Sequence, residues 1–381
     1  MTQLSLKKEP QLLDTQAWSG SFNGRESTLQ QLSPYVGKLK SGMARSLIEV
    51  FSEPGDVVLD PFCGSGVVPL EALLAGRVAY ANDLSPYAAL LTRGKLEAPA
   101  TSRTAMRHAE EVIAAIERDA PHADVSQVPQ WILEFFHQDT MREIVSAFDV
   151  LRARRDSFLT ACMMGILQHV RPGFLSYPAS HLVPYLRKAK YPPDVFPEMY
   201  RYRDVRTRLL AKVKRAYRNA GLPSDWSRRS YEVWQRNAAD LPIAAGGVDA
   251  IVSSPPYFGA LDYARDNRLR LWFLGCEDWK RLDGELTASE KVYLPQMTEC
   301  LREMNRVLKA GGYCILVLGD VERDGKLRRT AEILSELAAL VTSGDLRTEE
   351  IHDDIIPDDR RSRRKTRTTK HERILVMRKT R

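Results

Sequence analysis

The segment from Val57 to Asp83 reads VVLDPFCGSGVVPLEALLAGRVAYAND, and its pattern indicates the fold. The β-branched run Val57–Asp60 is typical of a buried parallel strand. It stops at a loop with glycines at positions 64 and 66, and an apolar helical pattern and a second strand follow. A strand, a glycine loop, a helix and a strand closed by the acidic Asp83 predict half of a nucleotide-binding α/β sheet.

The glycine loop also indicates what kind of ligand it holds. Gly64 and Gly66 let the backbone turn sharply and approach a ligand closely, and the helix that follows directs N–H groups at the site. Position 69 is proline, so the dinucleotide pattern G-x-G-x-x-G is incomplete. Without a third glycine, an adenosine lacking phosphates fits better than a dinucleotide. The pattern favours S-adenosyl-L-methionine (SAM) over NAD, with the Asp83 carboxylate accepting both ribose hydroxyls.

A second stretch, Ile251 to Gly259, reads IVSSPPYFG. A short apolar run, expected as a buried strand, opens here into a proline-stiffened loop. This loop offers two hydrogen-bond acceptors and an aromatic ring, the groups needed to hold a flat base by its exocyclic amine. The sequence therefore predicts a base-binding loop at the end of this strand.

Together these motifs resemble those of a known family. DPFCGSG (60–66) and VAYANDLSPYA (78–88) resemble the cofactor motifs of SAM-dependent methyltransferases, and SSPPY (253–257) resembles the catalytic motif of DNA amino-methyltransferases. Those enzymes modify N4 of cytosine or N6 of adenine. Three further segments resemble other parts of the same fold: SPYVGKLKSGMA (33–44), RVLKAGGYCILVLGD (306–320) and ERILVMRK (372–379). The resemblance covers about residues 30–100 and 231–381.

The resemblance implies a fold, a cofactor and a set of site residues. The fold is a Rossmann-like, mostly parallel sheet with one antiparallel edge strand and a helical insertion, and the cofactor is SAM. The implied catalytic residues are Ser254, Pro255, Pro256 and Tyr257. The implied cofactor contacts are Tyr35, Asp60, Pro61, Phe62, Cys63, Gly64, Gly66, Asp83, Leu84, Asn237 and Ser253. Asn237 stands where related sequences often have an acidic residue, with Asp240 three positions on.

The catalytic motif suits methyl transfer to an amine whose lone pair is delocalised into the base. Ser254 Oγ and the Pro255 carbonyl would accept hydrogen bonds from the amine, and Tyr257 would stack on the base once it is flipped out of the duplex. A neutral Ser254, rather than an aspartate, resembles the cytosine-N4 set. Adenine N6, an amine in RNA, and a SAM-binding regulator without catalysis remain the alternatives.

The pattern of elements predicts three regions. Residues 1–100 hold an N-terminal arm and the cofactor half, residues 101–230 form a helical insertion, and residues 231–381 form the catalytic half with a basic C-terminal segment. Basic side chains in the insertion alternate with aromatic ones, which suits a phosphate backbone and unstacked bases; a solvated helical face is the alternative. These aromatic residues are Tyr185, Tyr191, Phe196, Tyr200, Tyr202, Tyr217 and Trp226.

Several finer expectations concern the catalytic half. Arg265, Arg268 and Arg270 follow the catalytic loop and would either contact phosphate or form a solvated face. A helix over Gln296–Leu308 should end at the glycine C-cap 309–312. Ile374–Met377 should form the edge strand, and the basic run 358–370 is a further candidate phosphate contact.

Composition limits the compartment and the partners. Lys and Arg outnumber Asp and Glu by 56 to 49, giving a net charge of +7 that suits a polyanion such as DNA. The five cysteines form no C-x-x-C pair, which argues against a metal site. No apolar run approaches the ~20 residues that cross a bilayer, and the N-terminal residues lack a signal-peptide pattern. We expect a cytoplasmic protein without a membrane partner, acting on DNA in a restriction-modification or solitary system, with a cognate restriction enzyme as a possible partner.

Overall fold

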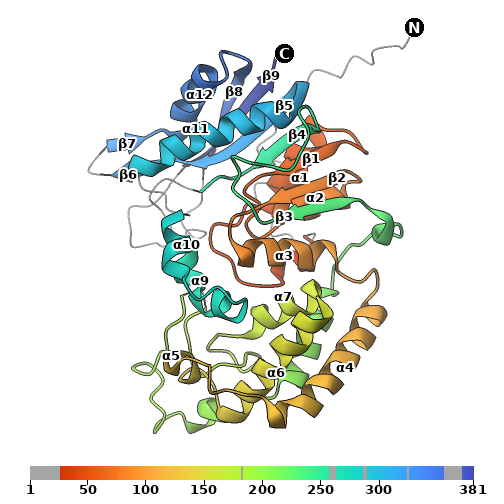
Figure 1. Cartoon of the computed structure of the whole chain (residues 1–381), viewed down its shortest axis with the longest axis vertical. Helices are drawn as coiled ribbons and strands as arrows, with labels where there is room; N and C mark the ends of the chain where they lie inside the picture. Colours follow the sequence, from red (N-terminus) through yellow and green to blue (C-terminus); the bar gives the residue numbers. More distant parts are fainter. Residues whose placement is uncertain (1–25, 182, 257–262, 286–289, 324–325, 356–370) are drawn as a thin grey trace.

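The computed structural model describes residues 26–181, 183–256, 263–285, 290–323, 326–355 and 371–381. A seven-stranded sheet runs in the order β3-β2-β1-β4-β5-β9-β8 (Figure 1). The strands are β1 (Val57–Asp60), β2 (Val78–Asn82), β3 (Tyr231–Trp234), β4 (Val248–Ser253), β5 (Leu308–Gly319), β8 (Leu346–Ile355) and β9 (His371–Lys379). The five strands β3, β2, β1, β4 and β5 are parallel. The strand order reverses between β1 and β4, and such switch points form ligand crevices in open α/β sheets.

The two faces of the sheet are covered by different helices. Alternate residues of β5 show this: Ile315 and Val317 join the core with α1 (Ser41–Phe51), α2 (Val67–Leu74) and α3 (Pro86–Leu96). Cys314 and Leu316 join the core on the opposite face, with α11 (Glu290–Val307) and α12 (Thr330–Val341). The apolar positions of α1, which are Met43, Ala44, Leu47, Ile48 and Phe51, recur at helical spacing and are all buried. The Rossmann-like, mostly parallel fold is confirmed.

The antiparallel strand lies one place further in than expected. β9 pairs antiparallel with β5 on one side and with β8 on the other, so the edge strand is β8. β8 reads LRTEEIHDDI, and this charged sequence hides it from a search for apolar runs. Charged side chains are common on edge strands because they discourage pairing with other chains. The prediction that 374–377 is the edge is therefore wrong.

The expected glycine cap after α11 is also wrong. The helix ends at Val307 and the chain enters β5 at once, because Leu308 already pairs with Val248 of β4. The register then shifts between Val248 and Ala250, and Gly311 takes a positive φ of 77° within this irregularity. The glycines therefore shape the start of a strand instead of closing a helix.

The insertion combines helices with a long irregular segment between residues 167 and 204. Its longer helices are α4 (Ser102–Asp119), α6 (Gln138–Arg154), α7 (Ser157–Ile166) and α8 (Val205–Ala216), with the short α5 (Gln130–Leu133). α7 ends at Ile166. Within the described residues of the insertion, strand-like pairing is limited to one bridge between Ala179 and Leu186. Figure 1 shows this region beneath the sheet, with α3 and α9 (Tyr263–Phe273) between the two.

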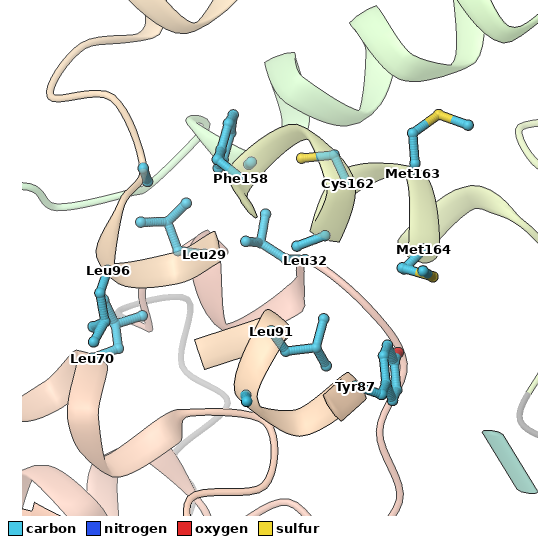
Figure 2. Packing of buried hydrophobic residues seen from close by; sticks show 14 of the residues in the cluster. Leu29, Leu32, Leu70, Tyr87, Leu91, Leu96, Phe158, Cys162, Met163 and Met164 are labelled. Carbon is cyan, nitrogen blue, oxygen red and sulfur yellow. The ribbon is translucent and has the colours of Figure 1, made fainter. Parts of the chain in front are cut away.

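The junction between insertion and sheet domain is closely packed. The 3-10 turn η2 (Thr28–Gln31) places Leu29 and Leu32 between α3 and α7, and Figure 2 shows them beside Leu91 and Phe158. Lys212 Nζ of α8 donates to the Gln31 carbonyl at 2.8 Å. The insertion is thus fixed to the cofactor half through an N-terminal segment far away in sequence.

Two of the aromatic residues expected on the nucleic-acid side serve this packing instead. Trp226 is buried and its Nε1 donates to the Ala98 carbonyl at 2.8 Å. The Tyr217 hydroxyl donates to the Pro99 carbonyl. These side chains fix the return of the chain from the insertion to the sheet. Among the described helices, none combines the length and apolar character needed to cross a bilayer.

Candidate active site

The carboxyl ends of β1, β2 and β4 surround a cavity of about 380 Å³. β1 ends at Asp60, β2 at Asn82 and β4 at Ser253. Because these strands are parallel neighbours, the residues that follow them emerge at one edge of the sheet. The loop after β1 and the loop after β4 therefore open onto the same space.

Most of the predicted site residues line this cavity. They are Tyr35, Asp60, Pro61, Phe62, Cys63, Gly64, Asp83, Leu84, Asn237, Ser254 and Pro256. Gly66, Ser253 and Pro255 are not in its wall: Gly66 begins α2, Ser253 is the buried last residue of β4, and Pro255 is buried close by. Tyr257 and the basic run 358–370 lie outside the described residues.

The glycines of the cofactor loop are required by the local backbone. Gly64 has φ +49°, and a Cβ there would lie 3.2 Å from Tyr35 Cε1. Gly66 has φ +74°, and a Cβ there would lie 2.6 Å from Thr92 Oγ1. Positive φ is costly for residues with a side chain. Both positions therefore need glycine for conformation as well as for space.

Two buried carboxyl groups frame the loop. Asp83 accepts hydrogen bonds from Gly64 N and Ser85 N, both at 2.9 Å. Asp60 Oδ1 accepts from Ser253 Oγ at 2.6 Å and from Phe62 N at 3.2 Å. Burial raises the pKa of Asp60 to about 7 and that of Asp83 to about 6, because desolvation penalises the charged form.

The chain at the end of β4 is hydrogen-bonded to both neighbouring strands, β1 and β5. Ser253 bonds to Asp60 of β1, as above, and the next residue turns towards β5, where Ser254 Oγ donates to the Val317 carbonyl at 3.1 Å. A hydroxyl has one proton and two acceptor lone pairs. With its proton directed at Val317, Ser254 Oγ presents acceptor capacity to the cavity.

One wall of the cavity comes from α11 and was not predicted. Its residues are Tyr293, Pro295, Gln296, Met297, Glu299 and Cys300. Positions 293, 297 and 300 share one helical face and are buried, a period visible in the sequence. Apolar residues at this helical spacing predict that one face of α11 is buried. They do not predict that this face lines a ligand cavity.

The segment before α1 contributes Lys38 to the wall. Its ammonium donates to the carbonyls of Gln30 and Ser33, at 3.0 Å each. Burial lowers the pKa of Lys38 to about 8. Among the described residues that line the cavity, Lys38 carries the single cationic side chain, and that charge is already engaged with backbone carbonyls.

These features fit SAM better than a phosphate-bearing nucleotide. The wall offers carboxyl groups at Asp60 and Asp83 but, over the residues that the structure describes, no cation directed at a pyrophosphate. Carboxylates suit ribose hydroxyls and a positively charged sulfonium, and about 380 Å³ lies within the usual range for small-molecule sites. Asp83 and the loop around Gly64 are the groups that would hold the nucleoside.

The arginines of α9 behave differently from one another. Arg270 is only 1% exposed; its Nε donates to the Met164 carbonyl at 3.3 Å and its guanidinium lies over the Tyr87 ring. It joins α9 to the insertion and cannot contact phosphate, so that expectation is wrong for Arg270. Arg265 is exposed and Arg268 half-buried. Phe273, also on α9, is buried and stacks on Phe148 with ring centres 4.6 Å apart.

The strand order, the glycine loop and the acidic residue that follows β2 are those of a Rossmann-like α/β sheet. Comparison with known proteins adds a partial sequence match. Residues 13–92 match the family model of the N6/N4 methyltransferases, described as DNA methylase. This match covers 80 of the 381 residues and includes the glycine loop and the residues that follow β2.

Solved structures with similar folds include several methyltransferases. A SAM-dependent methyltransferase from Methanosarcina mazei is 11% identical, with 88% of this chain and 97% of that chain covered and a TM-score of 0.35. TrmN from Thermus thermophilus is 12% identical, with coverages of 92% and 52% and a TM-score of 0.33. A putative DNA modification methylase from Thermus thermophilus, complexed with SAM, is 19% identical, with coverages of 38% and 51% and a TM-score of 0.24. This chain thus spans about half the length of the last two. No curated protein sequence matches it.

Proposed function

We propose that the protein transfers a methyl group from SAM to the exocyclic amine of a flipped base in DNA, with cytosine N4 as the preferred acceptor. The observation that carries this proposal is the orientation of Ser254. Its Oγ donates its proton to the Val317 carbonyl and lines the same cavity as Asp60 and Gly64. An acceptor held beside the cofactor loop is what a base amine needs.

The catalytic loop would activate the amine by accepting its protons. The amine lone pair is delocalised into the base, and acceptors on its hydrogens favour a pyramidal nitrogen with a localised lone pair. Ser254 Oγ and the Pro255 carbonyl are the proposed acceptors. Pro255 and Pro256 fix φ, so the acceptors are in place before the base arrives. Tyr257 would stack on the flipped base.

The cofactor half would hold the nucleoside and orient the methyl donor. We assign the ribose hydroxyls to the Asp83 carboxylate and the close backbone approach to Gly64 and Gly66. Leu84, Phe62 and Asn237 would surround the adenine, while Tyr35, Pro61, Cys63 and the Asp60–Ser253 pair complete the wall. When bound, the cofactor supplies a methyl group already activated on sulfonium. Holding donor and acceptor in one cavity then contributes by proximity and orientation.

The preferred base is inferred from Ser254 itself. A neutral serine, where an aspartate could stand, resembles the cytosine-N4 set, and adenine N6 is the alternative. The insertion, residues 101–230, is proposed to contact DNA through its exposed basic residues. A cognate restriction enzyme would be a partner if the protein belongs to a restriction-modification system.

Transfer from labelled SAM tests this function. Purified protein is incubated with sheared duplex DNA or with total RNA, and the nucleosides are then separated. We expect label in N4-methylcytosine from DNA, and a loss of about 100-fold or more in rate for Ser254→Ala with SAM affinity retained, by analogy with removal of one preorganised hydrogen bond. Label in N6-methyladenine would change the base, and label in RNA alone would refute the DNA assignment. A Ser254→Ala variant with the wild-type rate would remove the proposed role of the loop.

A further inference from the structure

Trp131 is an unusual surface residue of the insertion. It lies in the short helix α5 and is 36% exposed, although it packs edge-on against Phe135 at 6.3 Å. Tyr185, in the loop that approaches α5, is 50% exposed. Exposed aromatic side chains on one part of a surface commonly mark a binding site. Neither residue has a role in the cofactor cavity.

Arg268 of α9 lies against Trp131. Its guanidinium carbon is 5.7 Å from the centre of the Trp131 ring. Its Nη2 donates to the Pro184 carbonyl at 2.6 Å and its Nη1 to the Arg265 carbonyl at 3.1 Å. These bonds hold the guanidinium over the ring. The pair therefore presents a fixed cation and an aromatic surface together.

This pair is close to the proposed reaction centre along one helix. α9 begins at Tyr263, which lines the cofactor cavity, and Arg268 follows five residues later. Five residues of α-helix span about 7.5 Å along the axis. The rise between nucleotides in B-DNA is about 3.4 Å. The pair is thus within reach of nucleotides that flank one held in the cavity.

Further basic side chains surround the pair. The loop that carries Tyr185 is tied back by Ser180 N, which donates to the Tyr185 carbonyl at 2.9 Å. Lys188, three residues on, is exposed and lies 3.9 Å from Glu134, at the end of α5. Arg265 is exposed one turn before Arg268, and the buried Asp266 lies 3.8 Å from it. We name the following five residues the Trp131 platform: Trp131, Tyr185, Lys188, Arg265 and Arg268.

We propose that the Trp131 platform binds the DNA strand beside the target nucleotide. Its cations are complementary to phosphates, and its aromatic and guanidinium planes suit a base that loses its stacking partner when the target flips out. The inference rests on the proposed function, because a flipped target creates the unpaired neighbour. It deepens that function by assigning strand contacts to α5, the 184–190 loop and α9.

The test measures binding of a fluorescein-labelled duplex with one mispaired base, which leaves the stack more readily than a paired one, to the full chain between 50 and 200 mM salt. Trp131→Ala should weaken binding about tenfold, the usual scale for losing one base–aromatic stack, without changing the salt slope. Trp131→Phe should restore most of the affinity. Lys188→Gln should lower the salt slope by about one. Arg347→Gln, at an exposed arginine on β8 outside both the platform and the insertion, is the matched control and should leave both quantities unchanged.

The outcomes separate this inference from the proposed function. Wild-type affinity and slope in both Trp131→Ala and Lys188→Gln would overturn the platform, as would a duplex that fails to bind the wild-type protein. Binding that depends on the platform, together with intact SAM affinity but no methyl transfer to DNA, would retain the platform and refute the proposed function. Should Trp131→Ala lose SAM binding through misfolding, the exposed Lys188→Gln still decides the question.

Discussion

The carboxyl ends of the parallel strands and the insertion junction are both held by close contacts, but of different kinds. At the strand ends, short loops leave adjacent parallel strands, and bonds such as Ser253–Asp60 at 2.6 Å join them directly. At the junction, helices from distant parts of the chain meet through tight glycine contacts, such as Gly165 against the Leu32 carbonyl. The first arrangement can be inferred from local sequence motifs. The second depends on which segments meet in space.

A pair of glycines makes this difference concrete. Gly66 of the cofactor loop needs both its positive φ of 74° and the space beside Thr92. Gly165 lies inside α7, and a Cβ there would overlap the Leu32 carbonyl oxygen. Only Gly66 belongs to a recognisable motif. Substitutions in the two regions should therefore affect different properties.

The largest expected effect is on SAM affinity, at the carboxyl ends of the parallel strands. Asp83→Ala should weaken SAM binding by about 1.5–3 kcal/mol, roughly 10- to 150-fold, because hydrogen bonds to a charged group are lost. Isothermal titration calorimetry measures this change. Asp240→Ala removes an exposed carboxylate near the same end of the sheet and serves as the control. Equal SAM affinity in Asp83→Ala and wild type would contradict the ribose assignment.

A substitution at the insertion junction should change the free energy of unfolding. Gly165→Ala should lower the free energy of unfolding by about 1–3 kcal/mol, the usual cost of overpacking, because the new methyl group meets the Leu32 carbonyl and Lys212 Cε. Urea unfolding of both proteins gives the difference. Gly173→Ala, where a Cβ would have no neighbour within 4 Å, is the control in the same region. If both variants unfold like the wild type, the junction is looser than the packing indicates.

The smallest effect concerns pH. Asp60 and Asp83 have pKa values of about 7 and about 6, raised from 3.8 by burial. Their contribution to stability of the free protein is fully present below the unfolded value of 3.8 and is lost as the pH rises through 6 to 7. A cationic ligand favours the ionised carboxylates. SAM affinity should therefore rise about tenfold from pH 6 to pH 8, with proton release.

Calorimetry in two buffers of different ionisation enthalpy checks the linkage. Asp60→Asn should flatten the upper part of the pH dependence, because the group that titrates near 7 is then gone. A SAM affinity that falls as the pH rises would show that the two carboxyl groups stay protonated in the complex.

The sequence predicted the parts of the molecule that depend on short-range pattern. The β-branched run of β1 and the glycine loop that follows it appear where they were expected. The motifs around Asp83 and Ser254 lie far apart in the sequence, and both line one cavity. Parallel strand order explains this proximity, because it brings strand ends together whatever lies between them.

The failures have equally physical causes. β8 was missed because its charged residues suit an edge and lack an apolar run. Arg270 was expected near solvent or phosphate because arginine is rarely buried, yet carbonyls such as that of Met164, about a hundred residues away, satisfy it. The contribution of α11 to the cavity wall was missed because the helical spacing of apolar residues predicts that a face is buried, but not what it packs against. None of these contacts is encoded within a single stretch of chain.

The bond between Ser253 and Asp60 restricts how this protein could be redesigned to bind a different base. Ser253 immediately precedes Ser254. A substitution of Asp60 in β1 would therefore shift the Ser254 hydroxyl even though residues 254–257 had not been altered. A mutant library that varies only residues 254–257 would keep the bond between Ser253 and Asp60. A library that also varies position 60 would change this bond and with it the position of Ser254. Selection for a new base should accordingly randomise both positions together.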